Sequence, residues 1–245
     1  MTEQEWLTCR DSERMLAFVL ERSEGANARK MDLLSCACLR RILPALTDDR
    51  SRNALAFLER RADGTVTDVE CMSLSDSARH GWGAAADIAD AGHYATPLLC
   101  AMPDAGMAVW HAVDCDLQCI DGAADAAAHL EAPIPGRTPD KRRIPGDAEE
   151  WHAARERESA VQAQLFRCIF GNPFRRTVFE HGCRTPAVVA TARSIYDDRA
   201  FDRMGELADL LEAAGCTDTT ILAHCRSEGP HARGCFVIDV ILEKD

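Results

Sequence analysis

Apolar side chains recur three and four residues apart along most of this chain, a spacing that places them on one face of an α-helix. One such stripe consists of Met31, Leu34, Cys38 and Ile42. The closing run FVIDVIL is rich in β-branched residues, which favour strands, but no alternating partner strand precedes it. We therefore expect a docked terminal helix there. For the whole chain the pattern predicts an all-α fold, a multi-helix bundle.

Residues that start helices precede several of these segments. Thr2 with Glu5, and Thr67 with Glu70, have the spacing of a capping box, in which each side chain accepts a hydrogen bond from the other residue's backbone amide. Asp202 stands before another apolar stripe and is expected to cap the helix that follows it. These local signals predict where helices begin.

Composition divides the chain into three parts. Residues 1–131 form an N-terminal helical part, and its alanine-rich stretch 73–131 carries glycines and prolines that predict short helices with loose joints. Residues 132–148 hold four prolines and the basic run KRR, which indicates a flexible Pro-rich loop. Residues 149–245 form a C-terminal helical part. We expect both helical parts to pack as one composite domain, because the apolar stripes of the second need partners.

The charge distribution limits the binding partners. The formal net charge is −12, and residues 60–132 contain twelve acidic and three basic side chains. Generic nucleic-acid binding is not expected, since affinity for phosphates rests on a cationic surface. There is no apolar run of about 18 residues that could cross a bilayer, and the start MTEQEWLTCRDSER lacks the basic and apolar regions of a signal peptide. We expect a cytoplasmic protein that does not bind membranes.

The chain is cysteine-rich, with twelve cysteines spread along it without the spacing of a disulfide framework. In a reducing compartment such residues are mostly free thiols that behave as small buried hydrophobes. Most of the sulfur is therefore expected to lie in the core.

The C-terminal segment AGCTDTTILAHCRSEGPHARGC gathers several side chains that can bind a metal. Thiolate and imidazole are the ligands that Zn²⁺ prefers, and four of them complete a tetrahedral structural site. The predicted ligands are Cys216, Cys225, His231 and Cys235, with His224 as a spare. The short Cys-x2-4-Cys knuckle of most structural zinc sites is absent, so Zn²⁺ is a hypothesis weighed against buried thiols beside hydrogen-bonded histidines.

A second hypothesis for the same segment is a thiol nucleophile. Either Cys225 or Cys235 would be the thiolate and His224 or His231 the base, with Asp239 as an orienting group. A reactive cysteine needs a nearby cation or a helix N-terminus to lower its pKa. A chain with twelve cysteines and eight histidines offers such pairs by chance, so a catalytic residue is not assigned.

Several motifs at the two ends of the chain resemble those of a paralogous family of uncharacterised planctomycete proteins of the Gemmata type. The motifs are MTEQEWLTC, CACLRRI, LTDDRSR, IFGNPFR, IYDDRAFDRM, AGCTD, ILAHCR and GPHARGC. The resemblance is specific at both ends and weak between residues 78 and 145. It implies an α-helical, cytoplasmic protein and carries over no catalytic residue.

Together these features favour a non-enzymatic protein-interaction or adaptor module that binds another protein. The alternatives are a zinc-stabilised module that uses the C-terminal cysteines and histidines, and a thiol-dependent enzyme. The sequence does not identify the partner.

Overall fold

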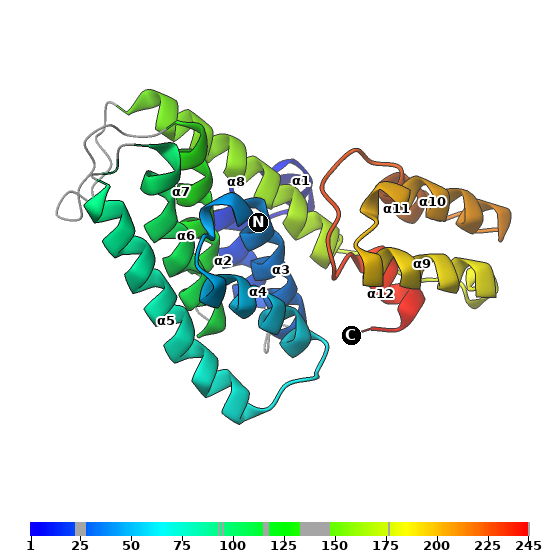
Figure 1. Cartoon of the computed structure of the whole chain (residues 1–245). Helices are drawn as coiled ribbons and strands as arrows, with labels where there is room; N and C mark the ends of the chain where they lie inside the picture. Colours follow the sequence, from blue (N-terminus) through cyan, green and yellow to red (C-terminus); the bar gives the residue numbers. More distant parts are fainter. Residues whose placement is uncertain are drawn as a thin grey trace. The chain divides into compact units, whose positions relative to one another are not determined.

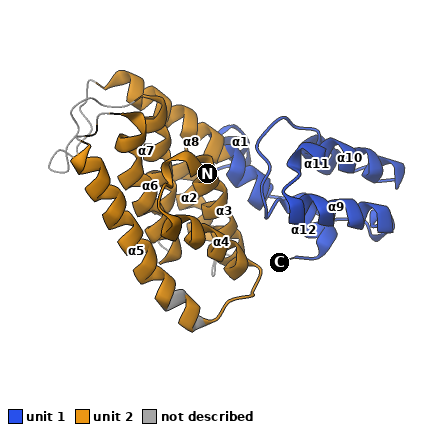
Figure 2. Cartoon of the chain, in the orientation of Figure 1, with its two compact units in different colours: residues 1–9, 164–245 blue, residues 10–163 orange. Residues whose placement is uncertain are grey.

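The computed structural model describes residues 1–22, 28–92, 94, 96–114, 118–132, 148–175 and 177–244. Throughout these residues the regular secondary structure is helical and no strand occurs, which confirms the predicted all-α class (Figure 1). The chain forms two compact units (Figure 2). Unit 1 consists of Met1–Cys9 and Gln164–Asp245, and unit 2 of Arg10–Ala163.

Unit 2 is a bundle of long helices. Its elements are α2 (Ser12–Arg22), α3 (Ala28–Arg41), η1 (Leu43–Ala45), α4 (Asp49–Ala62), α5 (Asp68–Ala91), α6 (Pro97–Val113), α7 (Gln118–Glu131) and the part of α8 (Glu149–Phe170) up to Ala163. Helix α6 packs against α5 and α7, while α3 packs against α4 and α7. Small buried residues, mainly alanine, fill the contacts of α6 and α7 and allow their backbones to approach closely.

The prediction of short, loosely jointed helices in residues 73–131 is wrong. Gly106 and Gly122 lie inside helices, at points of close contact. A Cβ on Gly106 of α6 would lie 3.0 Å from the Cα of Trp82 in α5, and one on Gly122 of α7 would lie 3.1 Å from the Cβ of Ala108 in α6. These glycines serve helix packing, and α5 continues without a break over 24 residues.

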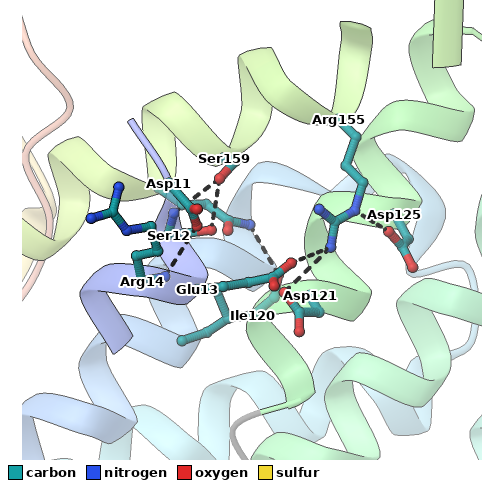
Figure 3. A network of polar contacts seen from close by, with 10 residues as sticks. Asp11, Ser12, Glu13, Arg14, Ile120, Asp121, Asp125, Arg155 and Ser159 are labelled. Atoms are coloured by element: carbon teal, nitrogen blue, oxygen red, sulfur yellow. Dashed lines mark hydrogen bonds and ion pairs between the residues drawn. The ribbon is translucent and has the colours of Figure 1, made fainter. Parts of the chain in front are cut away.

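An ion-pair network joins α2, α7 and α8 within unit 2 (Figure 3). The guanidinium of Arg155 donates to Asp125 at 2.7 Å and to Glu13 at 2.9 Å, and it lies 3.4 Å from a carboxylate oxygen of Asp121. One cation therefore serves three carboxylates. Burial, with the nearby charge of Glu13, raises the pKa of Asp121 to about 6.

Unit 1 combines the first helix of the chain with the C-terminal helices. Its elements are α1 (Glu3–Thr8), the end of α8, η3 (His181–Cys183), α9 (Pro186–Asp198), η4 (Phe201–Arg203), α10 (Met204–Ala213), α11 (Thr219–Cys225) and α12 (Phe236–Leu242). Helix α9 packs against α10 and α12, and α10 packs against α11. Helix α12 is the terminal helix predicted for FVIDVIL, and Val237, Ile238 and Ile241 on it are fully buried.

Several predicted helix boundaries are confirmed. Thr2 with Glu5 and Thr67 with Glu70 form complete capping boxes. The prediction that Asp202 caps a helix is wrong. Asp202 lies inside the 3₁₀ turn η4, which precedes α10. The N-cap of α10 is Arg203, and its side chain makes no capping hydrogen bond.

The two units differ from the parts predicted by composition. Residues 1–9 belong to the same unit as the C-terminal helices, and the boundary between the units falls within α8, after Ala163. Of the predicted loop 132–148, residues 133–147 lie outside the described residues. In the part of the chain that the structure describes, no helix has the length and apolar character needed to cross a bilayer.

Candidate metal centre

Four side chains of unit 1 form one group that could hold a metal ion. They are Cys168, His224, His231 and Cys235, which we call the Cys/His cluster. Each offers one ligand atom, and these four atoms all lie within 4.8 Å of one another. The cluster draws on three helices and a loop. Cys168 lies near the end of α8, His224 in the last turn of α11, His231 in the loop that follows, and Cys235 at the N-cap of α12.

Local backbone features bring these segments together. Gly171 ends α8 with φ +64°, a left-handed conformation that glycine adopts without strain. The ring of Phe236 packs on this glycine, where a Cβ would meet it at 3.2 Å, and on the ring of His224 at a centroid distance of 4.7 Å. Asp218 caps α11 by accepting hydrogen bonds from two backbone amides. Phe236 thus places the start of α12 against the ends of both α8 and α11.

The distances within the cluster suit a tetrahedral ion. With metal bonds of about 2.3 Å to sulfur and about 2.0 Å to nitrogen, tetrahedral ligand atoms lie about 3.3 to 3.8 Å apart. His224 Nε2 lies 3.2 Å from Cys235 Sγ, and Cys168 Sγ lies 3.9 Å from His231 Nδ1. These two pairs lie within a few tenths of an ångström of that range, and all pairs lie within 4.8 Å, so an ion would draw the remaining ligand atoms closer together.

Hydrogen bonds outside the cluster orient its ligands. His231 Nε2 lies 3.3 Å from the carbonyl oxygen of Ser227. A carbonyl only accepts, so in the tautomer that carries its proton on Nε2 the ring donates to Ser227, and the lone pair of Nδ1 then faces Cys168. The backbone amide of Ala232 donates to the sulfur of Cys168. Such second contacts fix the tautomer and direction of metal ligands.

The pKa values of the two cysteines of the cluster are shifted in opposite directions. Burial raises the pKa of Cys235, but hydrogen bonds from Cys168, His224 and His231 outweigh it and hold that pKa well below its usual range. The hydrogen bond of Cys168 to Cys235, together with burial, raises the pKa of Cys168. Cys235 is therefore the thiolate of the pair. A metal ion would take this thiolate and displace the remaining proton from Cys168.

The sulfurs and the imidazoles of the cluster differ in exposure. Cys168 and Cys235 are buried, whereas His224 and His231 are half-buried. A cavity of about 430 Å³ lies beside His231, and its wall includes Cys225, Ser227 and Phe201. The sulfurs thus form the inner side of the cluster, and one imidazole borders a space open to solvent.

The structure brings together only part of the ligand set predicted from the sequence. His231 and Cys235 are in the cluster, and so is the spare His224. Cys216 lies instead beside Cys183, with which it shares a hydrogen bond, and Cys225 is packed in the core, where burial raises its pKa.

Sequence reasoning missed Cys168. Helices α9 and α10 separate this residue from the C-terminal segment. It lies on the apolar face of α8, where a cysteine is typically a core side chain. Its position next to the GNP turn was the one available signal.

The chain matches no protein-family model, no curated protein and no solved structure. The resemblance to the planctomycete family is not tested by these comparisons and stays a prediction.

Proposed function

We propose that this chain is a non-enzymatic helical interaction protein whose unit 1 is stabilised by one Zn²⁺ bound to Cys168, His224, His231 and Cys235. The observation that carries the zinc proposal is the convergence of two sulfurs and two imidazole nitrogens within 4.8 Å. All four come from unit 1, so the site lies within one compact body.

The donor set favours zinc over other common metals. Two thiolates and two imidazoles in a tetrahedral arrangement are typical of structural zinc, whereas Mg²⁺ and Ca²⁺ require oxygen ligands. Four protein ligands also leave no coordination position for a substrate or a catalytic water. The role that fits this closed set is structural.

Zinc would supply stability where the helices are shortest. Helices α11 and α12 have seven residues each, a length at which a helix depends on tertiary contacts rather than on its own hydrogen bonds. An ion bound by His224, His231 and Cys235 would fix the end of α11, the loop after it and the start of α12 against Cys168. Metal binding of this kind contributes directly to the free energy of folding.

The four side chains fit a thiol-dependent enzyme less well than they fit a zinc site. His224 Nε2 and Cys235 Sγ, 3.2 Å apart, resemble a base and a nucleophile. However, Cys235 is fully buried, and a substrate would have to reach its sulfur. A nucleophile also requires only one base, whereas a zinc ion uses all four side chains.

The interaction role is supported by a stack of aromatic rings in unit 2. The rings of Trp82 and Trp110 lie 5.4 Å apart, and those of Trp110 and His111 lie 5.5 Å apart. All three side chains are only half-buried. Tryptophan is enriched among residues that dominate binding energy, and its face attracts Arg and Lys. With the acidic excess of residues 60–132, these rings favour a basic protein partner.

Zinc content tests the metal proposal. The chain purified after expression with zinc is expected to contain one equivalent. Cys168→Ser is expected to lose it, and Cys216→Ser, which changes a buried thiol of the same unit outside the cluster, is expected to keep it. Less than a tenth of an equivalent in the unaltered chain, or zinc retained by Cys168→Ser and lost by Cys216→Ser, would refute the proposed ligand set.

Peptides displayed on phage and selected on the purified chain test the interaction role. We expect basic sequences whose binding is lost in Trp110→Ala and kept in Leu20→Ala, a change at an exposed residue in α2 of the same unit. Equal binding by both variants would argue against the aromatic stack as the binding surface.

A further inference from the structure

We infer that the Cys/His cluster is an oxidation site, at which peroxide converts Cys168 and Cys235 to a disulfide and releases the zinc ion. This inference rests on the proposed zinc site and concerns its regulation. It is carried by the position of both sulfurs in a single group of ligand atoms.

The two sulfurs are close enough to react with each other. They lie within 4.8 Å of one another and share a hydrogen bond. A disulfide requires about 2.05 Å between the sulfurs, so they must approach by less than about 3 Å. Cys235 stands at the N-cap of α12, next to the loop that holds His231, and the reaction requires its side chain to rotate and this loop to shift toward Cys168.

The reaction balances with one peroxide molecule. One thiolate attacks hydrogen peroxide, the O–O bond breaks, hydroxide leaves and a sulfenic acid forms. The second thiolate attacks the sulfenic sulfur, the S–S bond forms and a second hydroxide leaves. Two protons from solvent convert the hydroxides to water. The sulfurs lose two electrons and peroxide gains them, while Zn²⁺ keeps its charge and departs because a disulfide does not replace two thiolate ligands.

Peroxide can approach from the side of the imidazoles. His231 lines the cavity of about 430 Å³, whereas both sulfurs are buried and do not line it. Exchange of the His231 ligand would admit a molecule as small as hydrogen peroxide. Oxidation at the cluster should therefore be slower than at an exposed thiol.

Oxidation would release the loop between α11 and α12 and keep the link between α8 and α12. The disulfide would still join the end of α8 to the start of α12. His224 and His231 would lose their common ligand, and the loop between α11 and α12 would be released. Arg226 to Gly229 of this loop form a wall of the cavity, so the cavity would change with the redox state.

The test follows zinc and disulfide together in the full chain loaded with one equivalent of zinc. Hydrogen peroxide is added with a coloured zinc indicator, and peptide masses locate any disulfide. We expect the whole equivalent of zinc to be released at the rate at which a Cys168–Cys235 disulfide appears, and dithiothreitol with added zinc to restore the starting form. Amide exchange in residues 224–234 should become faster after oxidation.

A matched variant separates this site from the other thiol pair of unit 1. Cys183 and Cys216 share a hydrogen bond outside the cluster, so Cys183→Ser is expected to release zinc as the unaltered chain does. Zinc that stays bound while other thiols are oxidised, or that leaves without a Cys168–Cys235 disulfide, would overturn the oxidation site and leave the zinc site standing. A chain that binds no zinc would overturn both.

Discussion

The indole Nε1 of Trp6 donates a hydrogen bond of 2.9 Å to the carbonyl oxygen of Gly171, 165 residues further along the chain. Trp6 is fully buried, and Arg167 adds hydrogen bonds to the carbonyl oxygens of Trp6 and Cys9. Helix α1 is thus held against the end of α8, three residues beyond Cys168. The first residues of the chain therefore support the helix that carries a candidate zinc ligand.

Trp6→Phe is expected to lower the free energy of unfolding by about 1 to 3 kcal/mol, because the buried carbonyl of Gly171 loses its donor. Denaturant unfolding monitored by circular dichroism measures the change. Trp110→Phe, at a half-buried position in unit 2, serves as the control and is expected to change stability by less than about 1 kcal/mol. Equal effects of the two changes would contradict the importance of the Trp6 hydrogen bond.

The helical glycines of unit 2 predict opposite effects of the same substitution. Gly106→Ala would place a Cβ 3.0 Å from the Cα of Trp82, so the α5 backbone must give way by a few tenths of an ångström, and we expect a loss of about 1 to 3 kcal/mol. At Gly83 a Cβ would meet nothing within 4 Å, so Gly83→Ala should gain about 0.5 to 1 kcal/mol from helix propensity. Thermal unfolding of both variants checks the prediction, which fails if Gly106→Ala is neutral.

The raised pKa of Asp121 predicts a pH dependence of stability. Its pKa is about 6 in the folded chain, against 3.8 for an ordinary aspartate side chain, so between these values the folded state binds the proton more tightly. The contribution of Asp121 to stability therefore falls as pH rises through this window. Asp121→Asn should raise stability at pH 7 by less than about 1 kcal/mol, since solvent screens this partly exposed group.

Melting curves at pH 4 and pH 7 test this expectation. The gain in Asp121→Asn should be larger at pH 7 than at pH 4. Asp125→Asn is the matched control, since it removes the carboxylate that Arg155 contacts at 2.7 Å, and it should lower stability at pH 7. Two variants that shift stability in the same direction at pH 7 would contradict the raised pKa of Asp121.

Removal of zinc is expected to expose the loop between α11 and α12 to trypsin. The loop contains Arg226, paired with Asp209 and Glu212, and Arg233, whose guanidinium lies over the ring of Tyr196. With a strong chelator, cleavage after these two arginines should become several-fold faster. Cleavage after Arg193, inside α9, provides the internal control. An unchanged ratio of the two rates would mean that the metal does not hold the loop.

The sequence predicts the parts of this fold that depend on neighbouring residues. The capping boxes at Thr2 and Thr67 were predicted because their partners lie three residues away, and the terminal helix because its apolar face is continuous. Gly106 was misread, since a glycine that breaks a helix and one that admits a neighbouring helix look alike in sequence.

The candidate site was predicted in part for the same reason. His231 and Cys235 lie four residues apart, and the sequence alone could pair them. Cys168 joins them through tertiary packing, which places the end of α8 beside the loop before α12. Cys216 has the same side chain and lies nearer in sequence, but it follows α10 and packs against Cys183.

The division of the chain into units has a consequence for its synthesis. Unit 2 ends at Ala163, so a ribosome releases all of its residues before the last helices are translated. Residues 1–9 emerge before unit 2, yet their packing partners, Gly171 among them, are made after it. The Trp6 indole therefore lacks its hydrogen-bond acceptor, the carbonyl of Gly171, until residue 171 is made. A nascent chain halted after residue 163 should expose this tryptophan to a chaperone.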